Sequence, residues 1–302
     1  MVHILKQLLP ALLLIFPALA SGINIVSSIS PVNALTDGVT QGITTSTLLV
    51  PPNVSHHHYT LKPSDARALQ QADVVIWVGH SLETFLEKPI TNLSTKTTVI
   101  TLEDLPNLTL YAPRSNKNWG THNVQGHNHE SNIDPHLWLN PQNAIIIAKA
   151  IAETLSKIDV TNAKLYQANA NDMIKKINEL DKKLAAELAP VKDIPFLVFH
   201  DGYQYFEKYY HLNAVGSVSI DSDLPPSAQR LYQIHQQIQQ EKIPCVFAEV
   251  STSSAIITTL QRDTNIKMGE LDSMGKGHQF ADYLNLLQFD ADQLVGCLRA
   301  TK

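Results

Sequence analysis

The side chains best suited to chemistry in this sequence are histidines in three separate short segments. They are His56, His57 and His58 after a Pro-Pro-Asn turn, His136 in an Asp-Pro-His turn, and His200 at the end of the apolar run 196–199. Neutral imidazole is the commonest protein ligand for zinc and a good ligand for other first-row metals. Neighbours on an extended loop point to opposite sides, so at most two of the first three converge easily on one ion. The pattern raises the hypothesis that the three segments meet around a single metal ion.

Several candidate ligand residues, including two acids, lie at or just after the ends of predicted strands. His57 follows strand 45–50, Glu249 ends strand 245–249, and Asp272 follows strand 267–271. In open parallel sheets, ligands bind just beyond the carboxyl ends of the strands. Three imidazoles suit Zn²⁺ and leave one tetrahedral position, which we leave open between water, His56 and Asp272. A manganese site would need more carboxylates, and a histidine taken alone is more often solvated or packed in a core.

An enzyme is the rival class, because three histidines and a water are also the layout of zinc hydrolases and hydratases. Glu249 or Asp272 could serve such an enzyme as a base. The sequence has neither a His-Glu-x-x-His helix nor a Gly-x-Ser-x-Gly elbow, which argues against an enzyme, but these residues alone leave both classes open.

A second group of histidines, His122, His127 and His129, lies in the polar stretch 107–132. Asparagine, glycine, histidine and serine dominate this stretch, which predicts a surface loop. The loop could capture metal weakly, or it could be a disordered polar loop that binds nothing.

The first 20 residues have the character of a signal peptide. A weakly basic start precedes the apolar stretch 8–20, which ends in the small-x-small pattern Ala18-Leu19-Ala20. We expect cleavage after about Ala20 and export to the periplasm, with an uncleaved anchor as the alternative. Export makes Cys245 and Cys297 a candidate disulfide, against two buried thiols or a thiolate metal pair.

The bulk composition and the order of elements predict an α/β protein. The chain has 302 residues, 44% of them hydrophobic, and its net charge of -5 gives no reason to expect nucleic acid. Strands predicted at 23–29, 45–50, 73–79 and 97–102 alternate with helices at 65–71, capped by Ser64, and 81–86, and a turn is predicted at 37–40. Further strands are expected at 196–199, 213–220, 245–249 and 267–271, with helices at 226–240, 253–263 and 281–297. A helix that begins over 141–148 and is capped by Asn140, and a longer one over 161–189 with an apolar stripe, separate the two sets. We therefore expect an N-terminal lobe (21–160), a linking helix (161–192) and a C-terminal lobe (193–302).

Five segments together resemble the cluster A-I metal-binding proteins of ABC importers, and among them the zinc-uptake members. They are Ser55–Asp65, Ala72–Gly79, Asp134–Pro141, Phe199–Phe206 and Gly269–Asp272, in the order of that family. The resemblance covers nearly all of the chain after residue 20. It departs from the family at His56, where Pro or Glu is common, and at His58, where Asp is common.

The resemblance implies two parallel-sheet lobes joined by one long backbone helix, with the metal site in the interlobe cleft. It implies His57, His136 and His200 as ligands of Zn²⁺, because manganese members carry glutamate in the third position. It also implies a disulfide between Cys245 and Cys297, a membrane permease of an ABC importer as partner, and a monomer. The remaining alternatives are a manganese or iron carrier of the same family and a secreted zinc hydrolase.

Overall fold

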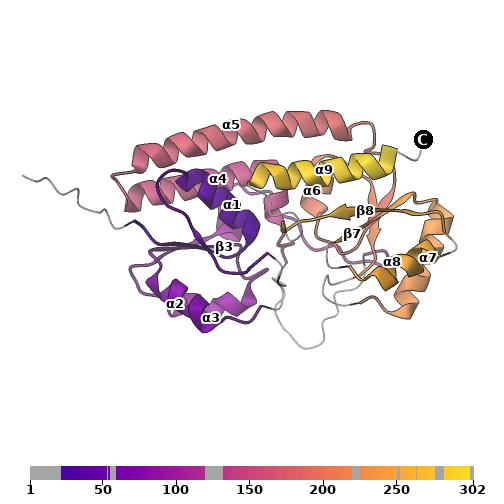
Figure 1. Ribbon diagram of the computed structural model, residues 1–302, viewed down its shortest axis with the longest axis horizontal. Helices are drawn as coiled ribbons and strands as arrows, with labels where there is room; N and C mark the ends of the chain where they lie inside the picture. Colours follow the sequence, from indigo (N-terminus) through magenta and orange to yellow (C-terminus); the bar gives the residue numbers. More distant parts are fainter. Residues whose placement is uncertain are drawn as a thin grey trace, which may run out of the picture.

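The structure is a computed structural model that describes residues 22–52, 54, 59–119, 132–219, 225–249, 252–262, 264–275 and 282–299. Within these residues the chain forms two four-stranded sheets whose paired strands are all parallel. Figure 1 shows one sheet in each half of the molecule, with the long helix α5 lying along one side of both. This is the α/β architecture predicted from the sequence.

The first sheet has the strand order β2-β1-β3-β4. Its strands are β1 (Ile25–Ser27), β2 (Thr47–Leu48), β3 (Val74–Trp77) and β4 (Thr98–Thr101). All four residues of β3 are buried, with Val74 and Ile76 in one apolar cluster and Val75 and Trp77 in another on the opposite face. A parallel strand covered on both faces needs a continuous apolar run, and the sequence supplies one.

The second sheet has the order β6-β5-β7-β8. Its strands are β5 (Phe196–Val198), β6 (Ala214–Ser217), β7 (Cys245–Glu249) and β8 (Lys267–Leu271). Every residue of β7 is buried. Cys245 of β7 is bonded to Cys297 of the last helix, which confirms the predicted disulfide.

The helices cover the sheets and join them. They are α1 (Ser30–Thr40), α2 (Pro63–Gln71), α3 (Glu87–Thr91), α4 (Pro141–Ile158), α5 (Ala163–Leu188), α6 (Gln204–Tyr209), α7 (Ala228–Glu241), α8 (Ser254–Gln261) and α9 (Tyr283–Arg299), with 3₁₀ turns η1 (Thr84–Leu86), η2 (Leu102–Asp104) and η3 (Leu137–Leu139). α4 begins as predicted, since the Asn140 side chain accepts from the backbone of Gln142 and Pro141 takes the first position. No helix in the described part of the chain is long and apolar enough to cross a bilayer.

Helix α5 connects the two halves through its apolar stripe. Ile177, Leu184 and Leu188 are fully buried, and Met173 and Leu180 pack against the same core. α5 contacts α1 and α4 of the first half and α9 of the second. One continuous core therefore runs through both halves. Each sheet also has one smaller apolar cluster on the face opposite this core.

Three local expectations were wrong. Residues 37–40, predicted as a turn, form the end of α1, because Asp37 accepts from Asn33 one turn earlier and from Ser46, and Gly38 lets Met173 of α5 approach closely. Residues 81–86 contain only the short turn η1, and the helix α3 follows it. Lys62, not Ser64, is the N-cap of α2, since Pro63 already takes a helical position.

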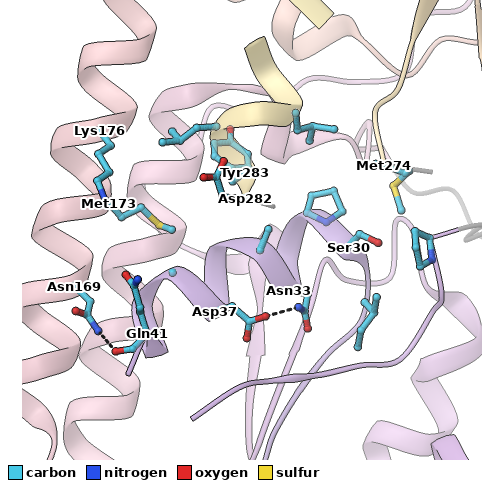
Figure 2. Close-up of a pocket in the computed structure, with 18 of the residues that line it drawn as sticks. Ser30, Asn33, Asp37, Gln41, Asn169, Met173, Lys176, Met274, Asp282 and Tyr283 are labelled. Atoms are coloured by element: carbon cyan, nitrogen blue, oxygen red, sulfur yellow. Dashed lines mark hydrogen bonds between the residues drawn. The ribbon is translucent and has the colours of Figure 1, made fainter. Parts of the chain in front are cut away.

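A pocket of about 550 Å³ lies between α1, α5 and the start of α9 (Figure 2). Several polar groups of its wall are hydrogen-bonded to one another: Asn33 donates to Asp37, and Asn169 donates to the carbonyl oxygen of Gln41. Met173 and Met274 supply apolar wall. The histidines considered below do not line this pocket.

Candidate metal centre

Two of the predicted ligands, His136 and His200, meet in the structure. His200 lies two residues after β5, and His136 immediately precedes η3 in the turn that leads to α4. Their Nε2 atoms are 3.5 Å apart, and the side chains are almost wholly buried, with 3% and 4% of each residue exposed. Segments 64 residues apart in the chain thus bring two imidazole nitrogens together.

Each histidine has a carboxylate at its other ring nitrogen. Asp134 Oδ1 lies 2.9 Å from Nδ1 of His136, and Glu249 Oε1 contacts Nδ1 of His200. A carboxylate at Nδ1 favours the tautomer with the proton on Nδ1, which leaves the lone pair of Nε2 available. Metal-bound histidines carry such partners almost always, because the partner fixes both the ring orientation and the tautomer.

Asp134 is held in place by several donors. Its Oδ1 also accepts from the backbone of His136 at 3.0 Å, and its Oδ2 accepts from Nε2 of Gln204 at 2.9 Å. The hydroxyl of Tyr205 donates to the Asp134 carbonyl at 2.8 Å. Burial by itself would raise the pKa of Asp134, but the hydrogen bonds from His136 and Gln204 hold it below its usual value. Helix α6, which follows the His200 segment, therefore also positions the partner of His136.

The space beside the two Nε2 atoms is kept open by Gly202. A Cβ at this position would lie 2.4 Å from Nε2 of His200 and 3.3 Å from Nε2 of His136. Two nitrogens bound tetrahedrally at about 2.05 Å from one zinc ion are about 3.3 Å apart. The 3.5 Å separation of the two Nε2 atoms and the space left by glycine at position 202 together fit a shared ion.

A group of buried acids lies beyond His200. Asp290 Oδ1 accepts from the backbone of Asp272 at 2.9 Å, and the Tyr203 hydroxyl lies 3.5 Å from Glu249 Oε1 and accepts from the backbone of Ser273. Burial raises the pKa of Tyr203 and of Asp290 well above their usual values, and the nearby carboxylates add to the effect.

Arg114 ties the stretch 109–119 to the segment that carries His200. Its guanidinium contacts Asp201, donates to Glu207 of α6 at 2.6 Å, and lies over the ring of Trp119. Burial raises the pKa of Glu207 to about 7, with Arg114 acting against that rise. The same stretch continues along β6, where the backbone of Ser217 donates to the Asn118 carbonyl at 3.1 Å.

Trp138 connects the His136 turn to the second half of the molecule. Its indole Nε1 donates to the Ser273 carbonyl at 2.9 Å, and the Tyr283 hydroxyl of α9 donates to the Trp138 carbonyl at 2.6 Å. The residues around His136 are thus bonded to α6, to the loop after β8 and to α9. His136 and His200 belong to one closely packed body.

None of the other residues predicted for the site joins this histidine pair as a third ligand in the described part of the chain. His57 and its neighbours His56 and His58 lie outside the described residues, as do His122, His127 and His129. Asp272 is buried, but its Oδ1 accepts from the backbone of Met274 at 3.2 Å. Among the residues that the structure describes, no three potential ligands come together as a metal-binding group.

Three residues of this centre were not predicted in these roles from the sequence: Gln204 and Gly202 were given no role, and Glu249 was considered only as a base. A local signal existed for Asp134, which stands two residues before His136. Glu249 could be found only through the sheet order, because β7 pairs with β5 and ends beside it.

Comparisons with known proteins identify the family of the chain. The model of one protein family, described as zinc-uptake complex component A periplasmic, matches residues 25–297. The chain is 35% identical over 305 residues to the high-affinity zinc uptake system protein ZnuA of Brucella abortus (strain 2308), covering 91% of each chain. It is 33% identical over 312 residues to the protein of the same name from Yersinia pestis, covering 98% of each.

Solved structures share the fold. A crystal structure of ZnuA superposes with a TM-score of 0.77 at 23% identity, covering 92% of this chain and 99% of that one. A Mn-bound periplasmic metal binding protein from Candidatus Liberibacter asiaticus gives 0.75 at 25% identity, covering 91% and 99%. Since the family model spans most of the sequence and relatives above 30% identity align over nearly their full length, the chain belongs to the family of periplasmic zinc-uptake component A proteins.

Proposed function

We propose that His57, His136 and His200 hold one Zn²⁺ and that the protein delivers this ion to the membrane permease of an ABC importer. The observation that carries the proposal is the pair of Nε2 atoms at 3.5 Å, each on a ring whose Nδ1 already has a carboxylate partner. Two imidazoles at this distance with their lone pairs available fit adjacent positions of a tetrahedral ion. His57 would supply the third nitrogen from the loop after β2.

Family membership makes the chain a transport component and not an enzyme, which removes the zinc hydrolase as an alternative. The manganese carrier is the second candidate, because a Mn-bound relative has the same fold. Zinc is favoured here, since borderline imidazole ligands suit zinc, whereas manganese prefers oxygen ligands.

We also propose how the chain is exported and how it is divided into lobes. Residues 1–20 would be a signal peptide cleaved after about Ala20, and the mature protein would work as a monomer in the periplasm. Residues 21–160 and 193–302 would form two lobes joined by the helix in 161–192. Mass spectrometry of the N-terminus and light scattering of the purified protein test the cleavage and the monomer.

The central experiment is a metal titration of the stripped protein. Wild-type protein is expected to bind one Zn²⁺ per chain, and X-ray absorption at the zinc edge should show three imidazole nitrogens. Loss of binding in each of His57→Ala, His136→Ala and His200→Ala would support the ligand set. Full affinity in any one of them would remove that residue from the site.

A further inference from the structure

Glu249 contacts the histidine pair from a strand far from both histidines in the sequence. β7 pairs with β5 in parallel, with Val198 opposite Phe247, so two residues later His200 lies beside Glu249. Glu249 Oε1 contacts Nδ1 of His200, and the carboxylate is buried, with 7% of the residue exposed. The contact therefore depends on the register of two neighbouring strands.

Asp134 and Glu249 each place a carboxylate at Nδ1 of one histidine, but they are held in place differently. Asp134 stands two residues before His136 and is held by that residue's own backbone. Glu249 instead is fixed at the end of its strand, where its backbone donates to the hydroxyl of Thr252 at 2.9 Å, and the Tyr203 hydroxyl lies nearby at 3.5 Å.

The charge of the centre gives both acids a second role. Neutral imidazoles around a divalent ion leave two positive charges in a buried place, which is costly without compensation. Asp134 and Glu249 place a carboxyl group at the far side of each ring, where negative charge would offset the charge of the ion. A carboxylate at Nδ1 also makes Nε2 more basic, which strengthens a zinc–imidazole bond.

We propose that Glu249 is a positioning residue that raises the affinity of this centre for Zn²⁺, and its preference for Zn²⁺ over Mn²⁺, by fixing the orientation and tautomer of His200. This inference rests on the proposed function, because it assumes that His200 binds the ion. The preference follows because a more basic imidazole benefits zinc more than manganese, which favours oxygen ligands.

The test compares Glu249→Ala, Glu249→Gln and Glu249→Asp by competition titration of the metal-stripped protein with Zn²⁺ and with Mn²⁺. Removing such a partner typically costs 10- to 100-fold in metal affinity. We expect a loss of about that size for Zn²⁺ in Glu249→Ala, a smaller loss in Glu249→Gln, whose amide oxygen can still accept from Nδ1, and smaller changes for Mn²⁺ throughout. The control is Asp181→Asn, which alters a carboxylate that accepts from Tyr209 and Tyr210 and contacts neither histidine.

A second readout reports the tautomer directly. In ¹H–¹⁵N spectra of the metal-free protein, His200 should carry its proton on Nδ1 in wild type and in Glu249→Gln, and should lose this preference in Glu249→Ala. Should Glu249→Ala fail to fold, the nearly isosteric Glu249→Gln still decides the matter through its zinc affinity.

The outcomes separate this inference from the proposed function. Wild-type zinc affinity in the Glu249 variants, together with loss of binding in His200→Ala, would overturn the role of Glu249 and leave the zinc site intact. Wild-type affinity in His200→Ala would overturn both. A loss in the Glu249 variants that is equal for Zn²⁺ and Mn²⁺ would overturn the claim of selectivity.

Discussion

The substitution Gly202→Ala tests the centre without removing any proposed ligand. The added methyl carbon would lie 2.4 Å from Nε2 of His200, about 1 Å closer than an ordinary van der Waals contact. The backbone of Gly202 does not lie in the left-handed region, so alanine itself is tolerated there. The strain must be relieved by movement of the His200 ring or of the backbone next to it.

The size of the effect follows from the tolerance of a zinc site. Ligand distances vary by about 0.2 Å, so a ring displaced by about 1 Å no longer binds. A structural zinc site of four ligands contributes about 10–16 kcal/mol, or roughly 3 kcal/mol for each ligand. Loss of one ligand should therefore weaken binding roughly 100-fold.

The assay is competition with a zinc-sensitive fluorescent chelator, with thermal denaturation of the metal-free protein alongside. The matched control is Gly296→Ala in α9, where a Cβ would meet nothing within 4 Å. The control should bind zinc as wild type does. A folded Gly202→Ala protein with undiminished zinc affinity would refute the placement of the ion between these two rings.

Four further predictions concern the site and the frame. His136→Ala should lower zinc affinity by roughly 100-fold, since it removes one ligand; an isothermal titration that finds no change would exclude His136 as a ligand. Zinc should be released as the pH falls through the usual imidazole range, because protons compete for Nε2, and a titration with unchanged affinity at pH 5 would contradict imidazole ligation. Burial raises the pKa of Glu83 to about 7 from 4.5, despite a hydrogen bond from Ser28. The stability that Glu83 contributes is therefore fully present below pH 4.5 and is lost as the pH rises through about 7. Urea denaturation should show that Glu83→Gln removes about 3 kcal/mol of this pH dependence, and parallel curves for the two proteins would argue against it. Cys297→Ser should lower the free energy of unfolding by about 4 kcal/mol, since the bond to Cys245 closes a loop of 52 residues, and an unchanged urea midpoint under oxidising conditions would count against this.

The parts of the fold that were predictable are those whose burial pattern is local. The strands β3 and β7 are buried over consecutive residues, and the stripe of α5 at Ile177, Leu184 and Leu188 recurs at helical spacing. The start of α4 was equally plain, because the Asn140 cap and Pro141 act on adjacent backbone. Propensity rules apply where neighbours in sequence are also neighbours in space.

The errors came partly from contacts with distant parts of the chain and partly from elements too short to show a pattern. Gly38 looks like a turn residue, yet in α1 it provides the space that Met173 of α5 occupies. The short helix α6 gave no periodic signal, since six residues are too few to show one. For the metal centre, the histidines were recognisable by type, but the acid that orients His200 lies 49 residues away.

The stretch 109–119 has a consequence for how the protein can be dissected. Although it precedes α5, its Arg114 pairs with Asp201 and Glu207, and its Asn118 carbonyl accepts from Ser217 of β6. A fragment that starts after α5 would expose the edge of β6 and leave two buried carboxylates without their cation, which costs about 3–5 kcal/mol for a buried pair. Chimeras between relatives should accordingly exchange this stretch together with the second half, and fragment complementation should succeed only when both pieces are produced together.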